Sequence, residues 1–108
     1  MEFKLKIIDR LILLSILPIT GDFLEMRLAA DLRDRLNFNA DEQENFDLKL
    51  EDAENGKRYV WDEAKDREID CSFKNKELDL IKNAFKILDQ KKQLTAEHLG
   101  TYTKFMED

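Results

Sequence analysis

The chain has one cysteine, one proline, one histidine and three glycines among its 108 residues. A single cysteine excludes a disulfide within the chain and is typical of proteins in a reducing cytoplasm. One histidine and one cysteine are too few ligands for a Cys/His zinc site within one chain. The shortage of glycine and proline limits the number of turns, so the composition indicates helices joined by short loops.

The chain also lacks a long apolar run, since none reaches the about 20 residues that a membrane-spanning helix needs. Three basic residues before the apolar segment 11–17 resemble the start of a secretory signal. However, Glu2 and Asp9 interrupt them, and no small-residue cleavage site follows. We therefore expect a cytoplasmic protein without a membrane segment.

Motifs for catalysis, metal binding and nucleotide binding are missing as well. The three glycines stand apart from one another, so no glycine-rich phosphate loop is present. The acidic group around Asp41 lacks the glycine of a calcium loop. Cys71 is expected as a small buried side chain, and His98 as a surface or capping residue. We assign no catalytic residue, metal or cofactor and predict that the protein is not an enzyme.

The charge of the chain is unevenly distributed. Residues 37–73 carry 12 acidic and 5 basic side chains, whereas the segments on either side are close to neutral. The formal net charge of −6 at pH 7 therefore comes from the middle of the chain. Such a surface repels phosphate backbones and favours basic partners.

The apolar pattern predicts two helices in the first third of the chain. Residues 4–17 are expected to form a helix that ends at Pro18 and is apolar on two faces. Its second face carries Ile7, Leu11 and Leu14, which indicates either a central core helix or a homodimer contact.

The second helix is predicted over residues 22–36, because Asp22 and Glu25 have the spacing of a capping box. Leu24, Leu28 and Leu32 form its expected core stripe. Asn39 with Glu42 repeats the capping pattern and predicts a short helical turn through Asn45.

The period then changes from that of a helix to that of a strand. Phe46, Leu48 and Leu50 alternate with charged residues, as in a half-buried strand. Asn55-Gly56 is a strong hairpin signal, because a type I′ turn needs positive φ at both central positions. With these two residues at the turn, Leu50 pairs with Trp61, Asp52 with Tyr59 and Lys49 with Asp62.

A third strand is predicted through Ile69, Cys71 and Phe73, which extends the hairpin to a three-stranded antiparallel meander. The helical pattern returns from Asn75 to about Lys91. Thr95 is expected to cap a last helix, in which Leu99, Tyr102 and Met106 face the core and Leu94 packs on Leu99. The chain is thus expected to form one α+β domain over residues 1–108, with two helices, a central meander and two final helices.

The hairpin offers candidate residues for binding a partner. Aromatic side chains on the inner face of a sheet are usually core, yet a sheet of three strands is small enough to expose one of them to a partner. We therefore single out the two aromatic residues and the carboxylates around them: Tyr59, Trp61, Glu51, Asp52, Glu54 and Asp62.

Two alternatives involve nucleic acid. Helices followed by a hairpin are typical of a winged-helix DNA-binding module, but four acidic residues surround the wing-tip pair Lys57 and Arg58. An acidic surface that imitates DNA and blocks a basic site on another protein fits the charge better. The same charge is also found on an ordinary solubilising surface.

The segment Leu13 to Phe38, "LLSILPITGDFLEMRLAADLRDRLNF", and the tail "LTAEHLGTYTKFM" resemble a group of small uncharacterised proteins of tailed bacteriophages and prophages. The pattern of the group consists of an apolar first helix, a Leu-Leu-Pro ending, a Gly-Asn/Asp-Phe start, an acidic middle and a closing Leu-Thr-x-x-His segment. This chain differs in its longer and more charged hairpin. The resemblance implies a phage or prophage gene and carries over no functional residue.

These observations lead to one expectation about function and two alternatives. We expect a phage or prophage accessory protein that acts by protein binding, either with itself or with a host or virion protein. An acidic inhibitor of a nucleic-acid-binding protein is the first alternative. A winged-helix-like DNA binder is the second.

Overall fold

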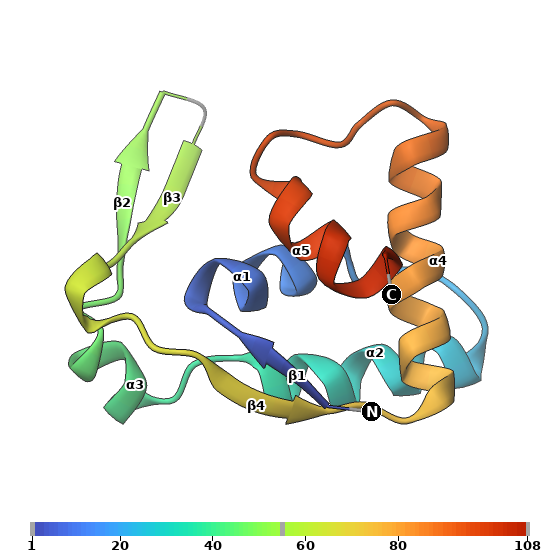
Figure 1. Cartoon of the computed structure of the whole chain (residues 1–108), viewed down its shortest axis with the longest axis horizontal. Coiled ribbons are helices and arrows are strands. Elements are labelled where there is room, and N and C mark those ends of the chain that lie inside the picture. The colour runs from blue at the N-terminus through green and yellow to red at the C-terminus, as the bar shows by residue number, and fades with distance from the viewer. Residues whose placement is uncertain (1, 55, 108) are drawn as a thin grey trace.

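The structure, a computed structural model, describes residues 2–54 and 56–107 and has an α+β fold (Figure 1). Its elements follow the order β1, α1, α2, α3, β2, β3, η1, β4, α4 and α5. The strands form two antiparallel pairs, β1 (Glu2–Leu5) with β4 (Ile69–Ser72) and β2 (Lys49–Ala53) with β3 (Gly56–Val60). The predicted three-stranded meander is therefore wrong, since β4 pairs with the N-terminal strand and not with the hairpin.

Strand β1 also corrects the predicted first helix, which begins three residues later than expected, as α1 (Ile7–Ile16). Phe3 and Leu5 alternate inward from β1, and Phe3 pairs with Cys71. The backbone N–H of Lys6 donates to the Asp9 carboxylate at 2.9 Å, which caps α1. Four residues are too few to show a strand period beside the long apolar helix pattern that follows them.

Capping signals placed the next two helices correctly. Helix α2 (Phe23–Leu36) begins after Asp22, whose carboxylate accepts from the N–H of Glu25 at 2.8 Å. Helix α3 (Ala40–Asn45) begins after Asn39 in the same way, with Glu42. Both predicted capping boxes are confirmed, because short polar side chains satisfy the free N–H groups of a first turn.

The main core lies between α1, α2, the β1–β4 pair, α4 (Asn75–Gln90) and α5 (His98–Met106). Helix α4 was predicted within one residue at its C-terminal end. Phe3, Phe73 and Phe105 form an aromatic group in this core, with ring centroids 4.4 Å apart for Phe3 and Phe105. Ile69 and Cys71 are half-buried against the same core. The expected inward face of β4 is thus confirmed, although its partner strand is β1.

The last helix differs from its prediction. It starts at His98, three residues after the expected cap, and the N–H of Thr95 donates to Nδ1 of His98 at 2.8 Å. Leu99, expected in the core, is 57% exposed, and Thr101 and Phe105 are buried instead. Thr101 donates to Asp9 at 2.6 Å, and Lys104 lies 2.6 Å from the same carboxylate. The polar Thr101 therefore points inward, while Tyr102 and Met106, which were predicted to face the core, are partly buried against it.

A second, smaller cluster lies where the hairpin joins the helices, and it consists of buried Ile7, Phe38, Phe46 and Leu48 with Leu11, Leu14 and Trp61 packed against them. Phe46 caps the end of α3 and Leu48 precedes β2, so neither belongs to the strand in which it was predicted.

Within the part of the chain that the structure describes, no helix has the length and apolar character needed to cross a membrane.

Candidate interaction surface

The hairpin, which the sequence marked as the partner-binding element, has a different register from the one predicted. Leu50 pairs with Tyr59, Asp52 with Lys57 and Glu51 with Arg58, which is a shift of two residues. Gly56 lies in β3 with a φ of 120°, and Ala53 is its partner. The predicted type I′ turn rests on Asn55, which lies outside the described residues. A shift of two preserves the faces, so Leu50 still lies beside an aromatic residue.

The predicted site residues do not form one patch. Tyr59 on the hairpin is 47% exposed. The carboxylates Glu51, Asp52 and Glu54 on the same hairpin are exposed as well. Trp61 is half-buried in the second cluster, and Asp62 accepts from the N–H of Ala64 as the cap of η1 (Glu63–Lys65). Only the outer part of the hairpin is therefore available to a partner.

The hairpin is also not the acidic element. Its three carboxylates, Glu51, Asp52 and Glu54, are balanced by Lys49, Lys57 and Arg58, and Glu51 and Asp52 each lie opposite a basic residue. The excess negative charge lies instead on α3 and on the segment from Asp62 to Asp70.

Some of that acidity is used inside the fold. The Arg10 guanidinium, which is buried, binds Glu42 at 2.6 Å and donates to the carbonyl oxygens of Leu36 and Asn37. The hydrogen bond from Arg10 lowers the pKa of Glu42 below its ordinary value, against the opposing effect of burial. At the surface, Lys65 lies 2.9 Å from Asp47 and lowers the pKa of that carboxyl. Arg10 carried no sequence signal for this role.

The three residues proposed for self-association, Ile7, Leu11 and Leu14, pack in the second cluster. Phe38, Phe46, Leu48 and Trp61 cover this face of α1 from within the same chain. The sequence analysis left two interpretations of this apolar face, a central core helix or a homodimer contact, and the packing agrees with the central core helix. No second subunit is needed to cover it.

The surroundings of Cys71 and His98, the two residues considered for chemistry, do not favour a reactive role. Burial raises the pKa of the Cys71 thiol, which favours the unreactive protonated form. His98 accepts a hydrogen bond near the start of α5. Among residues 2–54 and 56–107, no three His, Cys, Asp or Glu side chains are grouped as a metal site would need.

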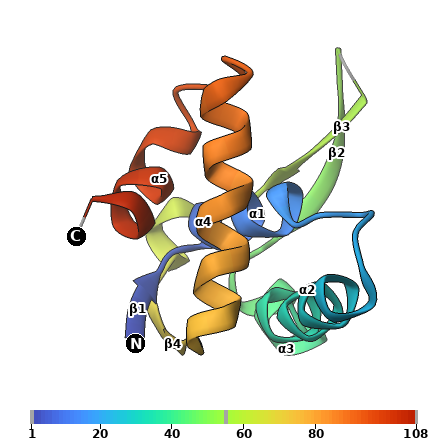
Figure 2. The same cartoon turned by 90° about the vertical axis from the view of Figure 1, so that its right-hand side faces the viewer.

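The main feature that the sequence did not predict is a groove lined by residues of α2 and α4. Figure 2 shows these two helices side by side. The groove encloses about 590 Å³, and Leu24, Leu28 and Leu80 form its apolar part. A second hollow of about 270 Å³ shares Glu25, Leu80 and Asn83 with it and extends toward Ile87. The two hollows are therefore neighbours along α4.

Apolar side chains are concentrated at this groove. Phe23 is 80% exposed and Ile19 85% exposed, and both are next in sequence to residues that line the two hollows. Leu24, predicted in the core stripe, is 50% exposed at the groove. The reason is its position in the first turn, where α2 extends past the core that Ala29, Leu32 and Leu36 enter. Several large apolar side chains are thus exposed on or next in sequence to the residues that line these two hollows.

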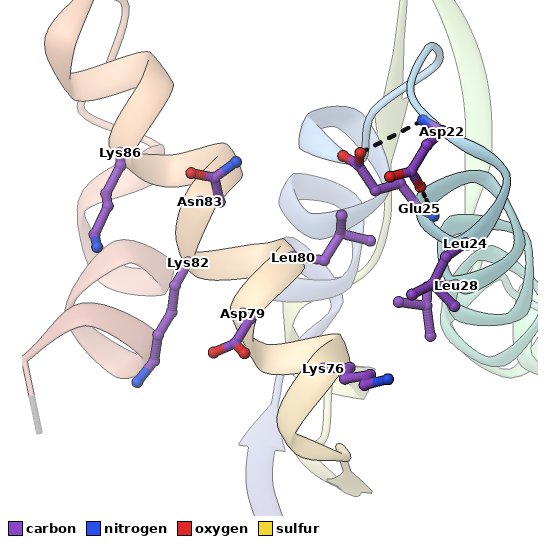
Figure 3. A pocket seen from close by; sticks show the side chains of 10 residues that line it. All are labelled: Asp22, Leu24, Glu25, Leu28, Lys76, Asp79, Leu80, Lys82, Asn83 and Lys86. Carbon is purple, nitrogen blue, oxygen red and sulfur yellow. Dashed lines mark hydrogen bonds between the residues drawn. The ribbon is translucent and has the colours of Figure 1, made fainter.

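The two edges of the groove carry opposite charge (Figure 3). Asp22 and Glu25 lie on the α2 edge, Lys82 and Lys86 lie on the side of α4 away from α2, and Asp79 and Leu80 lie between the two edges. Lys76 lies on the side of α4 nearer α2. None of these lysines forms an ion pair with another described residue. A sequence signal was present, since Lys82 and Lys86 are one turn apart on the polar face of α4.

Comparison of the chain with protein-family models, with curated proteins and with solved structures found no match. The candidate site therefore depends on the geometry and chemistry of this chain alone.

Proposed function

We propose that this protein acts by binding another protein through the α2–α4 groove and performs no reaction of its own. The observation that carries the proposal is the exposed apolar depression with Phe23 and Leu24 at its edge. Exposed aromatic and leucine side chains around an apolar centre with a charged rim have the composition of a protein interface. The sequence resemblance described above supports a phage or prophage accessory role in the host cytoplasm.

The test is a pull-down from bacterial cytoplasm that also contains an untagged copy of the chain, with three tagged forms of the protein: wild type, Leu24→Glu and Leu99→Glu. Leu99 is the matched control, because it is equally exposed but lies on α5, away from the groove. We expect wild type and Leu99→Glu to recover the same protein in stoichiometric amount, and Leu24→Glu to lose it. Recovery that Leu24→Glu leaves unchanged would contradict the proposal.

An acidic inhibitor of a nucleic-acid-binding protein is the second candidate function. The exposed carboxylates Asp41, Glu44 and Glu63 favour it, because they lie on α3 and η1 and form no ion pair with another described residue. Binding by this surface depends on charge, so its affinity falls steeply with salt. Binding by the acidic surface is expected to be lost when these three residues are neutralised and to be retained in Leu24→Glu. These two results distinguish the acidic inhibitor from a protein that binds through the groove.

The winged-helix alternative has less support. The helix before the hairpin, which would enter the groove of DNA, is α3, and its six residues include Asp41, Glu42 and Glu44 but no basic residue. A negatively charged recognition helix opposes binding to phosphate. We therefore do not propose direct DNA binding.

A further inference from the structure

We infer that the face of the protein that carries the groove packs against the same face of a second copy of this chain, in a two-fold symmetric dimer. This inference rests on the proposed function, because it names the partner of the same surface. It follows from the distribution of charge around the apolar centre.

The α2 edge presents the carboxylates of Asp22 and Glu25, and the α4 edge presents the ammonium groups of Lys82 and Lys86 (Figure 3). A purely acidic partner suits the α4 edge but is repelled by the α2 edge, and a purely basic partner meets the reverse problem. The surface thus requires a partner whose two charges are separated in the same way.

A second copy meets this requirement. A two-fold axis that lies in the interface and runs along the groove places the α2 edge of each copy against the α4 edge of the other. Each of the two equivalent contacts then joins carboxylates to lysines that have no partner among the described residues of the monomer. Asp79, which lies between the two edges, is outnumbered on α4 by Lys76, Lys82 and Lys86.

The same face carries exposed apolar side chains. Leu24, 50% exposed, lies on the α2 edge, Ile87, 42% exposed, lines the neighbouring hollow on α4, and Leu80 between the two helices is already buried. Phe23, 80% exposed, is next to Leu24 in sequence. Burial of these side chains removes the largest concentration of exposed apolar residues among those that the structure describes.

The remaining charge of the chain does not oppose this dimer. Figure 1 shows α4 at one end of the long axis, whereas α3 and the hairpin lie at the other. The acidic segments on either side of the hairpin therefore point away from the interface in both copies. Repulsion between the two negatively charged chains is reduced by that separation and by salt.

Sedimentation velocity over about 5 to 500 µM protein, the range for a small interface of modest affinity, tests the inference. We expect the weight-average mass of the wild type to rise from 12.8 kDa towards twice that value. Leu24→Glu remains monomeric, and Leu99→Glu follows the wild type. Lys82→Glu/Lys86→Glu, which places like charges together, weakens the dimer by about tenfold or more.

A mixture of charge variants tests the symmetry. Glu25→Lys retains the Asp22 cap and, like Lys82→Glu/Lys86→Glu, opposes its own dimer. An equimolar mixture of the two restores the dimer, because each altered edge then faces its complement. Circular dichroism confirms that both variants are folded before they are mixed.

Two results overturn the inference. The first is a wild-type mass that stays at 12.8 kDa over the whole concentration range. The second is association that Leu24→Glu leaves intact. If the wild type is monomeric but still recovers a different protein in a Leu24-dependent manner, the dimer is wrong and the proposed function stands. If no Leu24-dependent partner is recovered either, both are wrong.

Discussion

The two ends of the molecule use charged and apolar residues in opposite ways. At the end formed by α3 and the base of the hairpin, Arg10 is held by Glu42, and Ile7 and Phe38 are buried. At the end formed by α2 and α4, Phe23 and Leu24 are exposed, and three lysines have no described ion-pair partner. Our proposal therefore does not take a concentration of charge along the sequence as the mark of an interaction surface. Groups that the fold leaves without partners mark it better.

Arg10→Met gives the largest expected effect on the first end. The guanidinium is buried, binds a carboxylate and two carbonyl oxygens, and lies 3.9 Å from the centre of the Phe38 ring. Its removal leaves these acceptors without a donor, so we expect a loss of about 3 kcal/mol in the free energy of unfolding. Urea denaturation followed by circular dichroism measures it. A loss below about 1 kcal/mol would show that the network contributes little.

Trp61→Ala is expected to destabilise the same end by about 2 kcal/mol, because the indole packs half-buried on Phe46 and Leu48. If Trp61 were instead a partner-binding residue, as the sequence analysis considered, the change would weaken partner binding and leave the fold intact. Chemical denaturation together with hydrogen exchange of the hairpin amides distinguishes the two. A fully stable variant would return Trp61 to the interaction surface.

The pH dependence of stability in Glu42→Gln tests the contribution of the Arg10–Glu42 pair at the first end. Because Arg10 lowers the pKa of Glu42 in the folded state, this carboxylate stabilises the fold above its ordinary pKa of 4.5. That contribution is lost as the pH falls through the lower folded value. We expect wild type to exceed Glu42→Gln by about 1 kcal/mol at pH 7, and the difference to shrink below about pH 4.5. A difference that does not depend on pH would contradict this account.

The matched control for Glu42→Gln is Asp47→Asn. Both side chains of the Asp47–Lys65 ion pair are exposed to solvent. Such pairs contribute little to the free energy of unfolding. Thermal denaturation at pH 7 should therefore give the same midpoint for Asp47→Asn and wild type.

Leu24→Glu is also expected to have little effect on stability, within about 0.5 kcal/mol of wild type, since the side chain is half-exposed at the end of a helix. Leu99→Glu should behave alike. Thermal denaturation at a concentration low enough to keep the protein monomeric measures both. A loss of about 2 kcal/mol for Leu24→Glu would place Leu24 in the core, as the sequence pattern predicted.

Local signals in the sequence predicted much of the fold. The capping boxes at Asp22 and Asn39 fixed two helix starts, and the apolar period of residues 75–91 fixed α4. Such features depend on neighbouring residues only. The pairing of β1 with β4 joins residues almost 70 positions apart, and nothing in either short strand specifies its partner.

The candidate site was harder to predict for a related reason. Leu24 has the spacing of a core residue in α2, and only the position of the helix in the assembled fold shows that its first turn extends past the core. Trp61 and Leu11 are residue types that are common in interfaces, yet both are partly buried against the second cluster of the same chain. Whether an apolar residue is left exposed depends on distant elements, and a single sequence does not give their arrangement.

The most direct test of the central claim is photo-crosslinking in bacterial cells. Benzoylphenylalanine is incorporated in place of Phe23 at the groove or in place of Tyr59 on the hairpin, two exposed aromatic positions at opposite ends of the molecule. We predict a single discrete cross-linked species from position 23, of twice the chain mass if the dimer is correct, and none from position 59. Products from position 59 with none from position 23 would contradict the account and return the interaction surface to the hairpin.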